Sequence, residues 1–211
     1  MKKASYKSQA RFNLPKRPLF IVISGPSGAG KDTVLTKMKE LGYPLEYITT
    51  VTTRPQRDKE RNNVDYHFIS TERFQEMIER KEFLEWANVY GNWYGVPKEP
   101  VKRVLAKRQD IIVKVDIQGA ATIKEILPEA VFIFVIPASV KELTLRLKQR
   151  HTESPFDLAL RTKTAEEEIE QLSLFDYIVV NKRNEIDLAV SDIEAIITAE
   201  KCRVVPREVR L

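Results

Sequence analysis

The segment from Gly25 to Thr33 reads GPSGAGKDT, and its residue types and spacing are those of a loop that binds phosphate groups. Its glycines permit backbone angles that other residues avoid, so consecutive N–H groups can point inward around a polyphosphate, which Lys31 then reaches. An apolar run precedes the segment and a helical pattern follows it, which disfavours the alternative of a glycine turn that binds nothing. The predicted phosphate-binding residues are Gly25, Pro26, Ser27, Gly28, Ala29, Gly30, Lys31, Asp32 and Thr33.

Asp32 departs from this motif, in which a serine or threonine follows the lysine and its hydroxyl contacts Mg²⁺. A carboxylate is also a hard oxygen ligand for Mg²⁺, but it places a negative charge beside the phosphates. Asp32 therefore either binds the metal or repels the nucleotide. We expect it to bind Mg²⁺, directly or through one water, because an uncompensated charge about 4 Å from a phosphate costs about 4 kcal/mol at an effective dielectric constant of 20.

The phosphate loop needs a strand before it and a helix after it, and residues 19–24 and 33–41 have those patterns. Further strands are predicted at 45–50, 111–115, 131–136 and 177–180, and helices at 97–107, 139–150 and 185–200. Strands that alternate with helices in this way predict an α/β fold, with helices on both faces of a parallel sheet. The fold class is therefore a three-layer α/β/α arrangement.

Residues 51–96 interrupt this alternation. They begin with a polar, basic stretch without periodicity, continue with short strand and helix patterns, and end at Gly91 and Gly95, which we interpret as turn glycines. We expect a mixed lobe here that binds a second substrate, inserted between core segments 18–50 and 97–211. A proline and polar residues at 151–158 separate two helices and predict a lid at about 139–172.

The composition is that of one compact unit of 211 residues with 43% hydrophobic content. Six basic residues precede Leu19 without an acid, and the remaining chain has a net charge of −1, so residues 1–17 are predicted to be a flexible leader and not a nucleic-acid arm. No run has the length of a membrane span, and the only cysteine is Cys202. These features predict a cytoplasmic protein without nucleic-acid or membrane partners.

With these motifs in view, the chain resembles the guanylate kinase family from about Pro18 to about Glu200. The motifs that follow the phosphate loop in that family are, in order, TTRxxRxxE at 52–60, DYxF at 65–68, EW at 85–86, YG at 94–95 and DxQG at 116–119. The resemblance implies a P-loop kinase fold with a helical lid. It implies an enzyme that transfers the γ-phosphate of ATP to GMP, and to dGMP, giving ADP and GDP. It also implies Mg²⁺ as the cofactor that accompanies ATP.

The resemblance assigns a clamp on the GMP phosphate to Arg54, Arg57, Tyr66 and Tyr94, with Glu60 orienting the arginines. Guanidinium groups and phenolic hydroxyls are suited to this task, because both donate hydrogen bonds to phosphate oxygens. The alternative is that these arginines lie on a solvated surface loop.

Glu85 is similar to the carboxylate with which the family recognises guanine. One carboxylate matches the two donors N1–H and N2–H₂, whereas adenine presents an acceptor there and would leave the carboxylate unpaired. The resemblance further assigns Thr50 to the guanine O6 atom and Asp116 to GMP or to metal-bound water. The alternative for Glu85 is an exposed acid at a strand edge.

Arg146, Arg150 and Arg161 match three arginines of the family's lid, where they would neutralise charge on the transferring phosphoryl group. Asn181 matches a contact to the edge of adenine. The alternative for the arginines is a set of solvent-facing side chains on helices.

The chain departs from the family pattern at Val96 (usually serine or threonine), Lys114 (usually an acid) and His151 (usually glycine). Two other functions are compatible with parts of the pattern. A non-catalytic interaction module of the same fold would lose the loop lysine and the lid arginines, which this chain keeps. A kinase for another monophosphate is disfavoured by Glu85 and Thr50.

Overall fold

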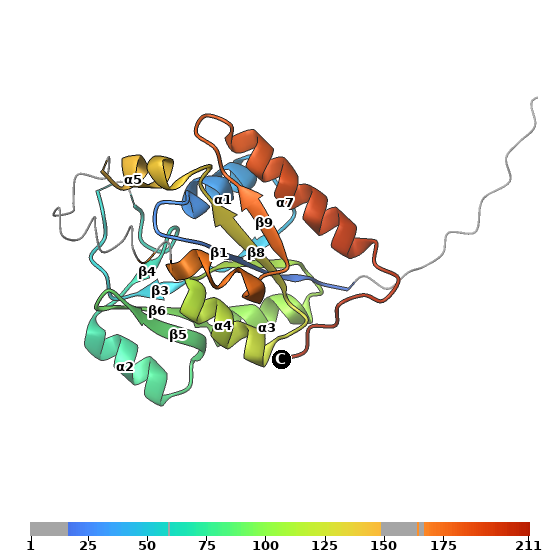
Figure 1. The fold of residues 1–211 in the computed structure, drawn as a ribbon. Coiled ribbons are helices and arrows are strands. Elements are labelled where there is room, and N and C mark those ends of the chain that lie inside the picture. Colours follow the sequence, from blue (N-terminus) through green and yellow to red (C-terminus); the bar gives the residue numbers. More distant parts are fainter. Residues whose placement is uncertain (1–16, 59, 149–163, 165–166) are drawn as a thin grey trace, which may run out of the picture.

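The computed structural model describes residues 17–58, 60–148, 164 and 167–211. Its main sheet has five parallel strands in the order β2-β7-β1-β8-β9. Figure 1 labels three of them, β1, β8 and β9. The five strands are β2 (Glu46–Tyr47), β7 (Ile111–Lys114), β1 (Phe20–Ser24), β8 (Val131–Ile136) and β9 (Tyr177–Val180). The central strand β1 therefore delivers the phosphate loop to the middle of the sheet, between β7 and β8.

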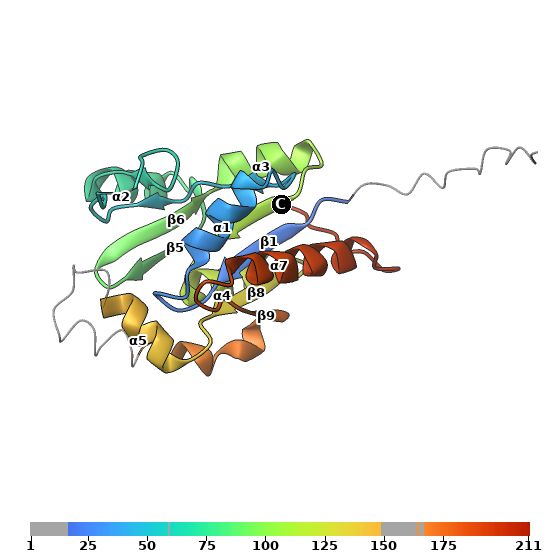
Figure 2. The same ribbon diagram turned by 90° about the horizontal axis from the view of Figure 1, so that it is seen from above.

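Helices cover both faces of this sheet (Figure 2). Successive residues of a strand point to opposite faces, so Ile21 and Ile23 of β1 belong to one apolar cluster and Phe20 and Val22 to another. Helices α1 (Lys31–Glu40) and α7 (Ile186–Lys201) contribute to the first cluster, and α3 (Lys98–Ala106) and α4 (Ile117–Ile126) to the second. The predicted three-layer fold is confirmed.

A second, smaller sheet lies beside the first, in the order β4-β3-β6-β5. Its strands are β4 (His67–Phe68), β3 (Val51–Thr52), β6 (Asn92–Pro97) and β5 (Phe83–Val89). Helix α2 (Thr71–Glu79) packs against it, with Ser70 capping the first turn and Phe74 stacked on Phe83 at 4.5 Å between ring centroids.

Two predictions about local structure were wrong. The strand expected at 45–50 is limited to the two residues of β2, because the chain then leaves the main sheet for the second one. Gly95 is not a turn residue: it lies within β6, where a Cβ atom would stand 2.7 Å from the Phe83 ring. Gly91, with φ of 78°, is the glycine that forms the turn.

Helix α5 (Val140–Lys148) begins as predicted after Ser139, whose Oγ accepts a hydrogen bond from Glu142 N at 3.1 Å. A 3₁₀ turn, η1 (Leu172–Leu174), precedes β9. Residues 1–16 of the predicted leader, and the lid residues Arg150, His151 and Arg161, lie outside the described residues. Within those residues, no helix is long and apolar enough to cross a membrane.

Candidate active site

A cleft lies where β1 and β7 end, between the phosphate loop and the second sheet. Most of the predicted site residues line it together. They are Gly25, Ser27, Gly28, Gly30, Lys31, Asp32, Thr50, Arg54, Arg57, Tyr66, Glu85, Tyr94 and Asp116. Pro26, Ala29, Thr33, Glu60, Arg146 and Asn181 are not in its lining, although several of them contact residues that are.

The phosphate loop requires glycine at Gly30, which precedes helix α1 with φ of 88°. Only glycine adopts this conformation readily, and a Cβ atom here would stand 2.3 Å from Asn181 Nδ2. The loop therefore packs closely on the residue that follows β9, and the positive end of α1 faces the cleft.

The rear of the loop is fixed by Arg146 and Asn181. The Ala29 carbonyl accepts hydrogen bonds from Arg146 Nη1 at 3.0 Å and from Asn181 Nδ2 at 2.9 Å, and Arg146 Nη2 donates to the Asn181 carbonyl at 2.7 Å. Both side chains thus lie behind the loop. Their predicted contacts with the phosphoryl group and adenine stay predictions.

Lys31 folds back over the loop. Its Nζ donates to the carbonyl oxygens of Gly25 and of Pro26, the latter at 3.1 Å. Burial lowers the pKa of Lys31, although the nearby carboxylates of Glu168 and Asp32 oppose that shift. A phosphate that entered the cleft would offer this ammonium group a stronger acceptor than neutral carbonyls.

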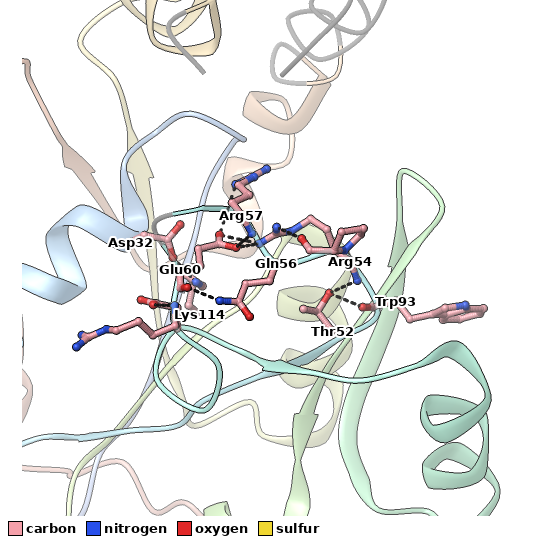
Figure 3. Close-up of polar contacts among 11 residues, drawn as sticks. Asp32, Thr52, Arg54, Gln56, Arg57, Glu60, Trp93 and Lys114 are labelled. Atoms are coloured by element: carbon pink, nitrogen blue, oxygen red, sulfur yellow. Dashed lines mark hydrogen bonds and ion pairs between the residues drawn. The ribbon is translucent and has the colours of Figure 1, made fainter. Parts of the chain in front are cut away.

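Glu60 holds both clamp arginines (Figure 3). Its carboxylate accepts two hydrogen bonds from Arg54 Nη2, at 2.8 and 3.0 Å, and one from the backbone N of Arg57 at 2.9 Å. Burial raises the pKa of Glu60, but the bonds from Arg54 and Arg57 outweigh it and the net pKa is lowered. Glu60 therefore stays ionised and fixes the direction of the Arg54 guanidinium.

Tyr66 and Tyr94 lie next to these arginines, with their rings edge to face at 6.1 Å between centroids. The Arg54 guanidinium carbon lies 5.4 Å from the Tyr66 ring. Burial raises the pKa of Tyr66, so its hydroxyl keeps the proton that it would donate to an anion. The four side chains together form a group of hydrogen-bond donors on one wall.

Glu85 also lines the cleft and is only 5% exposed. The register of β5 against β6 shifts between Phe83 and Glu85, which turns three consecutive side chains of β5 inward. Burial, with a contribution from the Asp116 charge, raises the pKa of Glu85 to about 8. Among the described residues its Oε2 has no hydrogen-bond partner, so the cleft presents an unpaired acceptor.

Asp116 stands beside Glu85 at the start of α4. Its Oδ1 caps the helix by accepting from Gly119 N at 2.7 Å, whereas Oδ2 is buried and has no partner among the described residues. Burial raises the pKa of Asp116. Thr50, 5% exposed, adds a buried hydroxyl to the same cleft.

Three polar residues of the cleft lining were given no role in the sequence analysis: Glu168, Asn92 and Tyr90. Lys114, which also lines the cleft, was singled out only as a departure from a family pattern. Tyr90 lies in the turn between β5 and β6, and Asn92 is the first residue of β6. The periodicity of the sequence does not predict that these side chains face the cleft. Glu168 lies within the segment predicted as the lid, and its carboxylate is close enough to Lys31 to influence the pKa of that lysine.

A metal ion would have few protein ligands here. The described residues contain no group of three or more acidic, cysteine or histidine side chains arranged to hold one. Asp32 and Asp116 both line the cleft and offer hard oxygen atoms. One or two carboxylates suffice for Mg²⁺ when substrate phosphates and water complete its shell, so the donor set fits that ion.

Comparisons with known proteins agree with this geometry. The family model described as guanylate kinase matches residues 17–200. Guanylate kinase 2, chloroplastic/mitochondrial, from Oryza sativa is 45% identical over 93% of this chain and 70% of its own length. Guanylate kinase from Caldanaerobacter subterraneus is 46% identical over 91% of this chain and 92% of its own length. The crystal structure of guanylate kinase from Anaplasma phagocytophilum matches with a TM-score of 0.75, at 30% identity over 90% of each chain.

Proposed function

The chain belongs to the guanylate kinase family, and from that premise we propose that its cleft holds ATP at the phosphate loop and GMP at the second sheet. The activity is transfer of a phosphoryl group from ATP to GMP, giving ADP and GDP for guanine nucleotide metabolism. One observation above all supports the assignment of ATP and GMP to two regions of one cleft. Lys31 of the phosphate loop and Arg54, which follows β3 of the second sheet and is held by Glu60, line a single cleft, so two phosphate-bearing substrates can meet there.

Guanine recognition follows from Glu85. The base offers two adjacent donors, and an ionised Glu85 carboxylate accepts from both, while Thr50 donates to O6. Adenine would leave the buried carboxylate unpaired, and sites of this kind discriminate between bases by about 10⁴. The same contacts would admit dGMP, because they do not involve the sugar.

The chemistry needs no general base. The GMP phosphate has a second pKa of about 6, so its attacking oxygen is already ionised near neutral pH. Arg54, Arg57, Tyr66 and Tyr94 hold that phosphate in line, and Lys31 lies on the outer phosphates of ATP. Positioning of the substrates and neutralisation of charge then supply most of the rate acceleration. Further candidates for neutralising charge on the transferring group are Arg146, Arg150 and Arg161.

Mg²⁺ is the cofactor that we propose to accompany ATP, since nucleotide kinases generally use it. When bound with ATP, Mg²⁺ would supply neutralisation of charge on the transferring phosphoryl group. Asp32 would hold it directly or through one water, and Asp116 would hold its water shell. Asp32 is also the group whose environment we consider further below.

A coupled assay of ADP release tests the proposal with GMP, dGMP, AMP, UMP and CMP as acceptors. We expect turnover with GMP and dGMP and a rate at least about a hundredfold lower with the others. Equal rates with AMP would refute the assignment of guanine recognition, and absence of ADP release with any acceptor would favour the interaction module. The predicted cytoplasmic location stays a prediction, because one relative has an organellar name.

A further inference from the structure

Lys114 is a cation at the junction of the two substrate regions. It ends strand β7, its side chain is only 13% exposed, and its Nζ forms an ion pair with Asp32 in the first turn of α1 (Figure 3). The same Nζ lies 4.0 Å from the centre of the Tyr66 ring, on the second sheet's side of the cleft. One side chain thus contacts both walls.

This ammonium group is charged throughout the physiological pH range. Burial alone lowers the pKa of Lys114, but the carboxylate of Asp32 and the Tyr66 side chain outweigh burial, and the net shift is upward. The Asp32 side chain is 62% exposed, so it can turn toward a ligand in the cleft. Lys114, in contrast, is enclosed by the Tyr66 ring and the end of β7.

Asp32 and Lys114 are also the positions where the chain departs from the pattern of a hydroxyl after the loop lysine and an acid two residues before Asp116. In the structure the side chains of these two residues contact each other. A hydroxyl is neutral, and an Asp–Lys ion pair is neutral as a unit. Asp32 alone would add a negative charge next to the phosphates of ATP, which like-charge repulsion disfavours.

We propose that Lys114 is a positioning residue for nucleotide binding: it compensates the charge of Asp32, and the two side chains act as one neutral unit at the end of the phosphate loop. This inference rests on the proposed ATP site. It explains how an acid at position 32 is compatible with ATP, and it assigns Lys114 a role through Asp32 and not through direct contact with a phosphate.

The test is a double-mutant cycle of Asp32→Ser and Lys114→Met, with ATP binding measured by calorimetry without Mg²⁺ at constant ionic strength. We expect Lys114→Met to weaken ATP binding at least about tenfold when Asp32 is present, and by less than about threefold when the protein also carries Asp32→Ser. Lys37→Met is the matched control, because Lys37 lies on α1, pairs with Asp187 at 3.3 Å and does not line the cleft.

Salt separates this electrostatic role from a merely structural one. The loss of ATP affinity in Lys114→Met should become smaller when the ionic strength rises from about 0.05 to about 0.5 M, because screening weakens the repulsion between Asp32 and the phosphates. A loss of packing would not respond in this way. If Lys114→Met does not fold, as judged by circular dichroism, Lys114→Gln replaces it in the same cycle, since glutamine removes the charge but can still hydrogen-bond to Asp32.

Equal losses in the wild-type and Asp32→Ser backgrounds would overturn the proposal, because Lys114 would then act on the nucleotide independently. No loss in Lys114→Met would overturn it as well. Failure of the proposed ATP site gives a different result: the wild-type protein would not bind ATP, and Lys31→Met would change nothing.

Discussion

The Glu85 carboxylate packs directly against Gly119 in the first turn of α4. A Cβ atom at position 119 would stand 2.8 Å from Glu85 Oε2, which is closer than such atoms approach each other in proteins. Glycine is therefore needed at this point of the DxQG segment because the Glu85 carboxylate, which we propose recognises guanine, occupies the space that a side chain would fill.

Replacement of Gly119 with alanine should displace the Glu85 carboxylate and raise the KM for GMP about tenfold or more, with a smaller effect on the KM for ATP. Alanine is the better helix former, so the melting temperature should not fall through helix propensity. Steady-state kinetics with both substrates provide the measurement. Ala121→Ser on the same helix is the control, and an unchanged KM for GMP in Gly119→Ala would contradict the contact.

Glu85→Gln should raise the KM for GMP and reduce the preference for GMP over AMP, because an amide offers guanine one acceptor and one mismatched donor. We expect the protein to stay folded, since the change removes a buried charge-bearing group without changing its volume. A competition assay measures the preference, with the exposed Glu125→Gln as the control. If the preference persists, guanine is recognised by other residues.

The pKa of Glu85, which burial raises to about 8, predicts that GMP binding releases a proton below that pH. The acid is then neutral before binding and must ionise to accept two donors from guanine. GMP affinity should therefore rise about fivefold or more between pH 7 and pH 8.5. Calorimetry in buffers of different ionisation enthalpy counts the released protons, and Glu85→Gln should release fewer.

The raised pKa of Glu85 also makes the stability of the folded protein depend on pH. Because the folded-state pKa lies above the ordinary value of 4.5, the folded protein binds a proton that the unfolded chain has lost between these pH values. The contribution of Glu85 to the free energy of unfolding is thus complete below pH 4.5 and is lost as the pH rises to about 8. Denaturant titrations without added nucleotide should show that the free energy of unfolding declines less with rising pH in Glu85→Gln than in the wild type. Part of the decline should remain, because the pKa of Asp116 is also raised.

Lys31→Met should lower kcat by about three orders of magnitude and change GMP affinity little, since the lysine would act on the phosphates of ATP. Lys37→Met on the same helix is the control for loss of a lysine. Retention of more than about a tenth of the wild-type kcat would disprove this role for Lys31.

Removal of the Asp32 carboxylate should reduce the effect of Mg²⁺ on ATP binding. If Asp32 holds the metal directly or through water, Mg²⁺ should strengthen ATP binding about tenfold more in the wild type than in Asp32→Ser. Calorimetric titrations with and without Mg²⁺ measure this difference. An identical Mg²⁺ dependence in the two proteins would rule out Asp32 as a ligand.

Much of this architecture could be predicted from the sequence because it depends on local patterns. The strands at 20–24 and 131–136 are buried on both faces and therefore read as continuous apolar runs, and Ser139 caps α5 at the predicted position. Gly95 was misassigned as a turn residue because a glycine that makes room for a neighbouring ring has the same sequence appearance as one that forms a turn.

The ion pair between Asp32 and Lys114 could not be predicted in the same way. The two residues are far apart in the sequence, and their contact depends on the parallel pairing of β1 with β7. In the sequence each is visible only as a separate departure from a motif. The position of Glu168 near Lys31 likewise depends on tertiary packing, for which a single sequence contains no periodic signal.

The two hydrogen bonds that the Ala29 carbonyl accepts at the rear of the phosphate loop bear on the thermodynamics of ATP binding. Fixing the backbone of one loop residue costs about 1–2 kcal/mol of conformational entropy. Because Arg146 and Asn181 already hold the loop in the folded chain, much of that ordering takes place when the chain folds and not when ATP arrives. A side chain behind the loop can thus influence affinity without touching ATP, by determining how much entropy the binding event must remove.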